Sequence, residues 1–131
     1  MTPPAAEPSP PPLFVGIDVA KDKLDLVASD DDRVRTFDND AEGRRLLIDA
    51  LGGRAPDCVV VESTGGYERP LLDTLLDAGL NVALVNPANV RAFARGLGVL
   101  AKTDALDARV LVKFAQLAAP RLLEKRSANR V

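Results

Sequence analysis

The sequence has no histidine and no tryptophan, and it has one cysteine and one tyrosine. The lack of histidine excludes acid–base catalysis by histidine, Ser-His-Asp triads and histidine-bound zinc. The single cysteine, Cys58, cannot form a disulfide within the chain or a thiolate cage around a metal. Any metal site would therefore use oxygen ligands, which suit magnesium, manganese or calcium.

Long apolar runs are also missing. No stretch approaches the roughly 20 apolar residues of a membrane-spanning helix, and the N-terminus lacks the basic and apolar regions of a signal peptide. We therefore expect a cytoplasmic protein with no membrane part. Of the 131 residues 47% are hydrophobic and only 4% aromatic, so we expect one small domain with an aliphatic core.

Charge is unevenly distributed along the chain, although its net value is only −2. Residues 1–85 carry 16 acidic and 8 basic side chains, whereas residues 86–131 carry 3 acidic and 9 basic ones. The basic second half indicates a polyanionic partner. A basic helix face that is merely solvated is the alternative.

Four basic side chains of this second half are candidates for contacts with nucleic-acid phosphates. Arg91 and Arg95 are one helical turn apart, and Lys102 precedes a pair of acids. Arg109 completes the set, with a salt bridge to the nearby acids as its alternative role. Tyr67 is expected either to pack in the interior or to stack on a nucleobase.

The first part of the chain predicts a tail followed by an antiparallel meander. Residues 1–12 contain six of the ten prolines and should be disordered. Alternating apolar and polar residues then predict strands at 13–20, 23–29 and 33–38.

The remainder predicts helices that alternate with buried strands. Asn39 and Glu42 have the spacing of a capping box ahead of a helix at 41–51. The later elements are a strand at 58–62, a helix at 70–79, a strand at 80–85 and helices at 87–95 and 103–119. This order predicts a five-stranded mixed sheet, with helices on both faces, in which the strand at 58–62 lies parallel to the first strand.

Two carboxylates end neighbouring strands of this predicted sheet. Asp18 is near the end of the first strand, and Glu62 ends the strand at 58–62. Because neighbouring strands are about 4.8 Å apart, the two groups should nearly touch where α/β sheets bind ligands. Two buried anions need a cation between them. The alternatives are a strand-end acid for Asp18 and an ion pair with lysine or arginine for Glu62.

A second acidic pair lies in the stretch KTDALDAR. Asp104 and Asp107 are three residues apart at an expected helix start and so share one face, with helix capping as their alternative role. Four carboxylates without histidine suit two divalent ions in phosphodiester chemistry. Asp18 would bridge the ions, Glu62 would hold one of them, and Asp104 and Asp107 would complete the other.

Three stretches resemble a known family. They are FVGIDVAKDKLDL, VVVESTGGYERPL and LVNPANVRAFARGLGVLAKTDALDARVL. They look like the N-terminal RuvC-like domain of DEDD transposases, which are recombinases of bacterial insertion sequences guided by a bridge RNA. The resemblance covers residues 13–120.

This resemblance implies an RNase H-like (RuvC-like) α/β fold, dependence on magnesium (or manganese), and cleavage and rejoining of DNA strands. Carried over residue by residue, the catalytic and metal-binding tetrad falls on Asp18, Glu62, Asp104 and Asp107. The resemblance also implies binding of DNA and of a guide (bridge) RNA, and assembly of the full-length protein as a homo-oligomer.

One part of the family pattern is missing from the sequence. In the family a C-terminal domain supplies a catalytic serine through a helical segment. Residues 121–131 look like the start of that segment, and Ser127 within it is not that serine. We therefore expect a truncated protein that does not recombine DNA by itself. A non-catalytic nucleic-acid-binding or assembly module is the alternative, and the chain is too short for a third possibility, an actin-like phosphotransferase.

Overall fold

The computed structural model of the protein describes residues 11–98 and 106–125. The strands are β1 (Phe14–Val19), β2 (Lys23–Ala28), β3 (Asp31–Asp38), β4 (Cys58–Glu62) and β5 (Val82–Val85). The helices are α1 (Ala41–Ala50), α2 (Arg69–Asp77), α3 (Pro87–Gly96) and α4 (Ala108–Ala118). Within the described ranges, no helix is long and apolar enough to cross a membrane.

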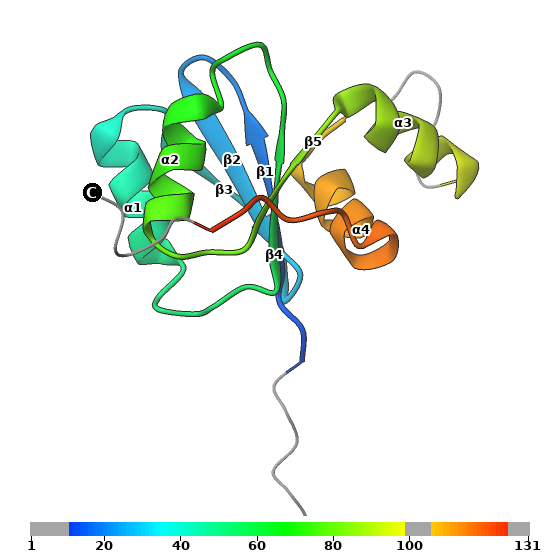
Figure 1. Ribbon diagram of the computed structural model, residues 1–131, viewed down its shortest axis with the longest axis horizontal. Coiled ribbons are helices and arrows are strands. Elements are labelled where there is room, and N and C mark those ends of the chain that lie inside the picture. The colour runs from blue at the N-terminus through cyan, green and yellow to red at the C-terminus, as the bar shows by residue number, and fades with distance from the viewer. Residues whose placement is uncertain (1–10, 99–105, 126–131) are drawn as a thin grey trace, which may run out of the picture.

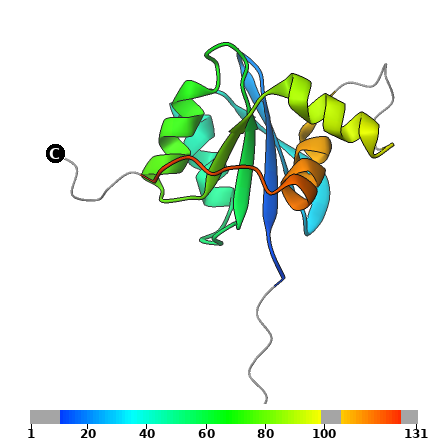
Figure 2. The ribbon, with the colours of Figure 1, turned by 45° about the vertical axis from the view of Figure 1, so that its right-hand side comes forward.

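The strands form one mixed sheet in the order β3-β2-β1-β4-β5. β1, β2 and β3 pair antiparallel, and β4 and β5 extend the sheet parallel to β1. Helices α1 and α2 cover one face of the sheet, and α3 and α4 lie on the other side (Figures 1 and 2). The predicted sheet is confirmed, and β1 and β4 end at the same edge.

Each face of the sheet has its own aliphatic core. Val15 and Ile17 of β1 point toward α1 and α2 and are fully buried, whereas Phe14 packs on the α4 side. Burial of each such aliphatic side chain stabilises the fold by roughly 1.5–3 kcal/mol. The alternation along β1 therefore fixes Asp18 on the same side as Phe14, the side that faces α4.

Helix α4 packs directly on β1 because Gly16 has no side chain. A Cβ atom at Gly16 would lie 2.5 Å from the carbonyl oxygen of Ala108 and 2.8 Å from the Cβ of Leu111. Only glycine allows this approach without a shift of the helix. The first turn of α4 is thereby held against the strand that carries Asp18.

The cap of one helix and the start of another differ from the sequence prediction. Helix α1 is capped by Asp40, whose side chain accepts a hydrogen bond from the Gly43 amide at 2.7 Å. The predicted cap at Asn39 is wrong, and Glu42 pairs with Arg45 (2.6 Å) instead of completing a capping box. Helix α4 begins at Ala108 rather than at residue 103, because Asp107 has an extended backbone and caps the helix there.

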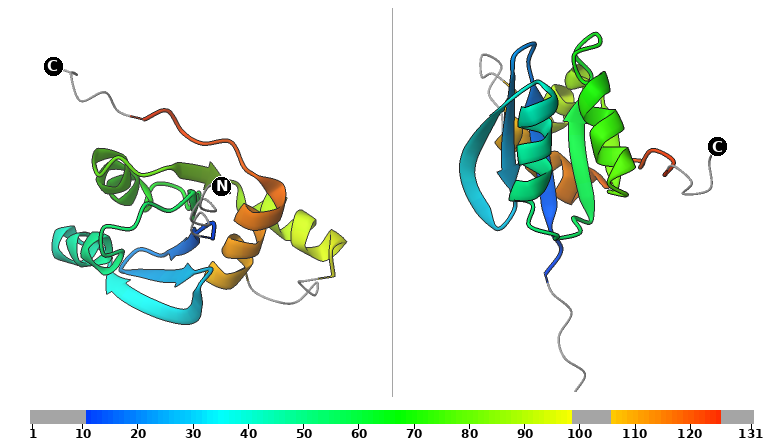
Figure 3. Two further views of the ribbon diagram at one scale, coloured as in Figure 1. Left: turned by 90° about the horizontal axis from the view of Figure 1, so that it is seen from below. Right: turned by 90° about the vertical axis from the view of Figure 1, so that its left-hand side faces the viewer.

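The chain after α4 also differs from the prediction. Residues 120–125 form no helix, although a helical segment was expected from 121. Pro120 has no amide hydrogen to contribute to a helix. Beyond it, the Leu123 amide donates a hydrogen bond to the carbonyl of Val82 (2.7 Å), and the Leu123 side chain packs against the core beneath α1 and α2. This segment therefore crosses from α4 toward α2 (Figure 3).

Candidate active site

Asp18 and Glu62 lie side by side at the carboxyl ends of β1 and β4. The two strands pair in parallel with Ile17 opposite Val61, so one step further Asp18 is opposite Glu62. The two carboxyl groups are close enough to share a hydrogen bond. Glu62 is only 8% exposed, and Asp18 is half-buried. The predicted adjacency is confirmed, while the role of the two acids stays a prediction.

The surroundings of Glu62 favour its protonated form. Burial, followed by the hydrogen bond to Asp18 and the repulsion between the two acids, raises the pKa of Glu62 to about 8. The positive charge of Arg91 on α3 lowers this pKa, but by less than the other effects raise it. An acid with a strongly raised pKa, at the edge of the sheet where the parallel strands end, is typical of a functional site.

Neither acid has a neutralising partner in the part of the chain that the structure describes. The ion pairs found there are all made by other residues. Arg91, which is half-buried, influences Glu62 without forming an ion pair with it. Within residues 11–98 and 106–125, no lysine or arginine therefore forms the ion pair with Glu62 that the alternative requires.

The second predicted pair is only half described. Asp107 caps α4, and its Oδ1 atom accepts hydrogen bonds from the amides of Arg109 (2.9 Å) and Val110 (3.2 Å). Both bonds use Oδ1, and no hydrogen bond to Oδ2 is found within residues 11–98 and 106–125. Among the described residues, no group of three or more acids or cysteines is placed to hold a metal ion. Asp104 and Lys102 lie outside the described residues, so the four-acid arrangement stays a prediction.

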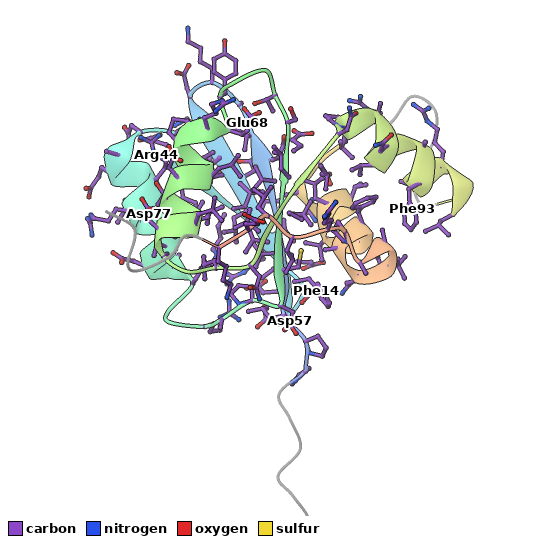
Figure 4. The ribbon with its side chains drawn as sticks, viewed as in Figure 1. Phe14, Arg44, Asp57, Glu68, Asp77 and Phe93 are labelled. Atoms are coloured by element: carbon purple, nitrogen blue, oxygen red, sulfur yellow. The ribbon has the colours of Figure 1, made fainter. Side chains whose placement is uncertain are left out.

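The described basic candidates occupy two places. Arg91 and Arg95 lie on α3, which begins directly after β5 at the edge where the acids lie. The ring of Phe93, labelled in Figure 4, meets the ring of Phe114 edge to face with centroids 5.3 Å apart, which holds α3 against α4. Arg109 instead donates a hydrogen bond to the Asp32 carbonyl at 3.1 Å. Its guanidinium therefore contacts β3.

Glu68, which the sequence analysis missed, organises the loop after Glu62. It is 5% exposed. Its Oε1 accepts from the Ser63 hydroxyl (3.4 Å) and the Thr64 amide (3.3 Å), and its Oε2 accepts from the Thr64 hydroxyl (3.3 Å) and the Gly66 amide (2.9 Å). Burial alone would raise the pKa of Glu68, but hydrogen bonds from three backbone amides and the Thr64 hydroxyl lower it below its ordinary value.

The same loop depends on glycine. Gly65 and Gly66 have φ values of 81° and 126°, which other residues rarely adopt. They let the chain turn back so that the Gly66 amide reaches Glu68. The available sequence signal was the second glutamate in ESTGGYE, at the start of a helix where an acid is favourable.

Asn39 ties this loop to the turn that follows Asp18. Its side-chain amide donates to the carbonyl oxygens of Ala20 (3.0 Å) and Tyr67 (3.2 Å). Its own oxygen accepts from Arg44 of α1 at 3.0 Å. Asn39 therefore joins the segments that follow both acids, a role that the sequence did not reveal because the three segments are far apart in the chain.

Comparison with known proteins supports this arrangement. A family model of DEDD type, described as a transposase, matches residues 15–130. The pilin gene-inverting protein of Moraxella bovis is 30% identical over 124 residues, which cover 90% of this chain and 38% of that protein. The chain thus spans well under half the length of this curated relative.

Solved structures show the same fold. The RuvC structure of Thermus thermophilus matches with a TM-score of 0.59 and 16% identity, over 85% of this chain and 99% of that one. The structure of T. thermophilus RuvC in complex with a Holliday junction substrate matches with a TM-score of 0.57 and 15% identity, over 86% and 99% of the two chains. The fold is therefore RuvC-like, in the RNase H-like class, as the sequence predicts.

Proposed function

Because this chain belongs to the DEDD transposase family, we propose that it is the metal-dependent catalytic domain of an insertion-sequence recombinase that cleaves and transfers DNA strands. The observation that carries the proposal is the acid pair. Asp18 and Glu62 end adjacent strands, lie within hydrogen-bonding reach of each other and have no ion-pair partner among the described residues. Such a pair is stabilised by a bound cation.

The donor set fits a hard divalent cation. Carboxylate oxygens are the ligands that Mg²⁺ and Mn²⁺ prefer, and the chain offers no histidine in their place. We assign Asp18 as a shared ligand and Glu62 as the ligand of one ion, with Asp104 and Asp107 completing a second. Two ions held by these residues would supply activation of the attacking oxygen and stabilisation of the leaving oxygen of a phosphodiester. Asp107 can cap α4 with Oδ1 and offer Oδ2 to an ion.

Several side chains position the acids and bring positive charge to the edge of the sheet where a nucleic acid is proposed to bind. Strand pairing holds the two carboxylates in place, and Glu68 and Asn39 fix the loops beside them. Arg91 and Arg95 bring positive charge to the same edge, and Lys102 and Arg109 are proposed to add further phosphate contacts. The proposed partners are DNA and a guide (bridge) RNA, and the longer protein is proposed to act as a homo-oligomer.

A second candidate function is a nucleic-acid-binding or assembly module without turnover. It is favoured by the capping role of Asp107 and by the lack of a cluster of three acids in the described ranges. This alternative predicts nucleic-acid binding that survives both Asp18→Asn and Glu62→Gln and that does not respond to divalent ions.

Thermal unfolding with and without Mn²⁺ tests the metal site. Without metal, and at a pH above 8 where Glu62 is ionised, Asp18→Asn should unfold at a higher temperature than wild type because it removes the repulsion between the two carboxylates. At about ten times its dissociation constant, Mn²⁺ should stabilise wild type by roughly 1.4 kcal/mol, which is several degrees, and the variant should lose most of this gain.

The matched control is Asp57→Asn, at the opposite end of the sheet (Figure 4). The Asp57 carboxylate accepts a hydrogen bond from the Leu13 amide at 3.0 Å, so the control also changes an acid that holds a loop. It should keep the full response to Mn²⁺. An Asp18→Asn protein that responds to Mn²⁺ as wild type does would count against the proposed site.

A further inference from the structure

One of the five aromatic side chains does not pack in the interior. Phe14 and Phe114 lie in the apolar cluster under α4, Phe37 packs against the core beneath α1 and α2, and Phe93 contacts Phe114. Tyr67 is 49% exposed. Tyr67 therefore does not pack in the interior, which was one of the two roles expected from the sequence. An exposed ring needs a further reason before a function is assigned to it.

The first reason is that the backbone beneath the ring is held firmly. The Tyr67 carbonyl accepts a hydrogen bond from Asn39, which is itself held by Arg44. The next residue, Glu68, is buried and accepts four hydrogen bonds from residues 63–66. The aromatic side chain is thus presented from a fixed loop, so little backbone freedom would be lost when a ligand binds.

The second reason is the position of this loop. It follows Glu62 directly. The side-chain nitrogen of Asn39 donates hydrogen bonds both to the Tyr67 carbonyl and to the carbonyl of Ala20, which is two residues after Asp18. Tyr67 therefore lies at the same edge of the sheet as the ends of β1 and β4, which carry the two acids. Space is open around Gly65 and Gly66: apart from the adjoining residues, no atom of the described part of the chain lies within 4 Å of a Cβ built at either position. Figure 4 shows Glu68 at this end of the molecule.

We propose that Tyr67 is a stacking platform for an unpaired nucleobase of the strand whose phosphate lies at the acid pair. The inference rests on the proposed function, since it requires a nucleic acid at this edge. A phenol ring stacks on any base, whatever the sequence. The base must be unpaired and splayed out, because neighbouring bases cover its faces inside a duplex. Arg69, the exposed first residue of α2, adds a positive charge two residues after Tyr67 in the chain.

The composition of the chain gives this inference a direct spectroscopic test. Tyr67 is the only tyrosine and there is no tryptophan, so tyrosine fluorescence reports on this one ring. The probe is a single-stranded oligothymidylate of about 12 nucleotides, added to the intact chain at low salt without divalent ions. Stacking should quench the tyrosine emission in a saturable way. An abasic strand of equal length should bind more weakly and leave the emission unchanged.

Affinities of variants, measured by anisotropy of a labelled strand, complete the test. Tyr67→Ala should bind the oligothymidylate roughly fivefold to 150-fold more weakly. Tyr67→Phe should keep the wild-type affinity because phenylalanine also stacks. Leu46→Ala is the matched control, since Leu46 is similarly exposed (45%) but lies on α1. It should bind as wild type does, and all variants should show the circular dichroism of a folded domain.

Each result decides the inference. Quenching together with weaker binding of Tyr67→Ala supports it. Binding without quenching, and with equal affinity for Tyr67→Ala, overturns it while the proposed function stands. An equal loss of affinity for duplex DNA also overturns it, because a paired base cannot stack on the ring. A wild type that binds no oligonucleotide contradicts both the inference and the proposed function. Impaired self-association of Tyr67→Ala with unchanged oligonucleotide binding would assign the ring to a protein interface instead.

Discussion

At the scale of the residue, Glu62 links the stability of the metal-free protein to pH. Its pKa is about 8 in the folded protein, against an ordinary value of 4.5. Between these values the folded state binds more protons than the unfolded state. The contribution of Glu62 to stability is therefore fully present below about pH 4.5, falls as the pH rises, and is lost as the pH passes through 8.

Urea unfolding at several pH values between 5 and 8, without divalent ions, tests this linkage. The free energy of unfolding of wild type should fall with pH, by at most about 1.4 kcal/mol per pH unit from this one group. Asp18→Asn should show a smaller slope, because the hydrogen bond to the Asp18 carboxylate and its repulsion both raise the pKa of Glu62. Equal slopes in the two proteins would contradict the coupling of these acids.

Glu68 is the second residue with a measurable role. Glu68→Gln keeps the size of the side chain but replaces one acceptor oxygen with an amide group that cannot accept a hydrogen bond from the loop. We expect it to lower the free energy of unfolding by about 1–3 kcal/mol, as measured by urea unfolding. Glu124→Gln, at an exposed position, is the control and should be nearly neutral. Identical unfolding of the two variants would show that Glu68 does not hold the loop.

At the scale of the element, the contact between β1 and α4 is the most sensitive feature. Gly16→Ala would place a methyl group against the Ala108 carbonyl and the Leu111 side chain, and overpacking of this kind costs roughly 1–3 kcal/mol. Chemical denaturation should show this loss. Gly96→Ala is the matched control, because Gly96 lies in α3 and, outside that helix, no atom of the described residues lies within 4 Å of an added Cβ. It should be neutral or slightly stabilising, and an equal effect of both substitutions would contradict the packing argument.

The elements show where sequence patterns suffice and where they fail. The buried run CVVVE predicts β4 at its observed bounds, and Asn86 with Pro87 predicts the observed start of α3. The start of α1 at residue 41 was predicted, but its cap was assigned to Asn39 instead of Asp40 because both are good capping residues. Only the structure shows that Asn39 is engaged with Ala20 and Tyr67 instead.

In the candidate site, too, some features could be predicted from the sequence and others could not. The adjacency of Asp18 and Glu62 followed from strand order and the right-handed crossover rule, which depend on patterns that the sequence displays. The roles of Asn39 and Glu68 depend on which loop carbonyls and amides come within reach after folding. Local sequence patterns contain no record of such contacts, so they indicate Glu68 only as an acid at a helix start and Asn39 only as a capping residue.

At the scale of the whole molecule, the two ends of the sheet have different roles. The acid pair and the loop fixed by Glu68 lie where β1 and β4 end. At the opposite end, the segment after α4 is anchored near Val82, where β5 begins. The central claim is that the edge with Asp18 and Glu62 binds a divalent ion. Three consecutive exposed acids, Asp30, Asp31 and Asp32, lie where β2 leads into β3 and serve as the comparison position for nonspecific attraction of a cation.

The most direct test is a nitrogen–proton correlation spectrum of the labelled chain with substoichiometric Mn²⁺, which broadens the signals of nearby amides. If the account is right, the amides of residues 18–20 and 62–64 should broaden first, and Asp18→Asn should abolish this effect. The amides around Val82 should keep their line widths. Broadening that begins at residues 30–32, or that is unchanged by Asp18→Asn, would contradict the claim that the acid pair binds the ion.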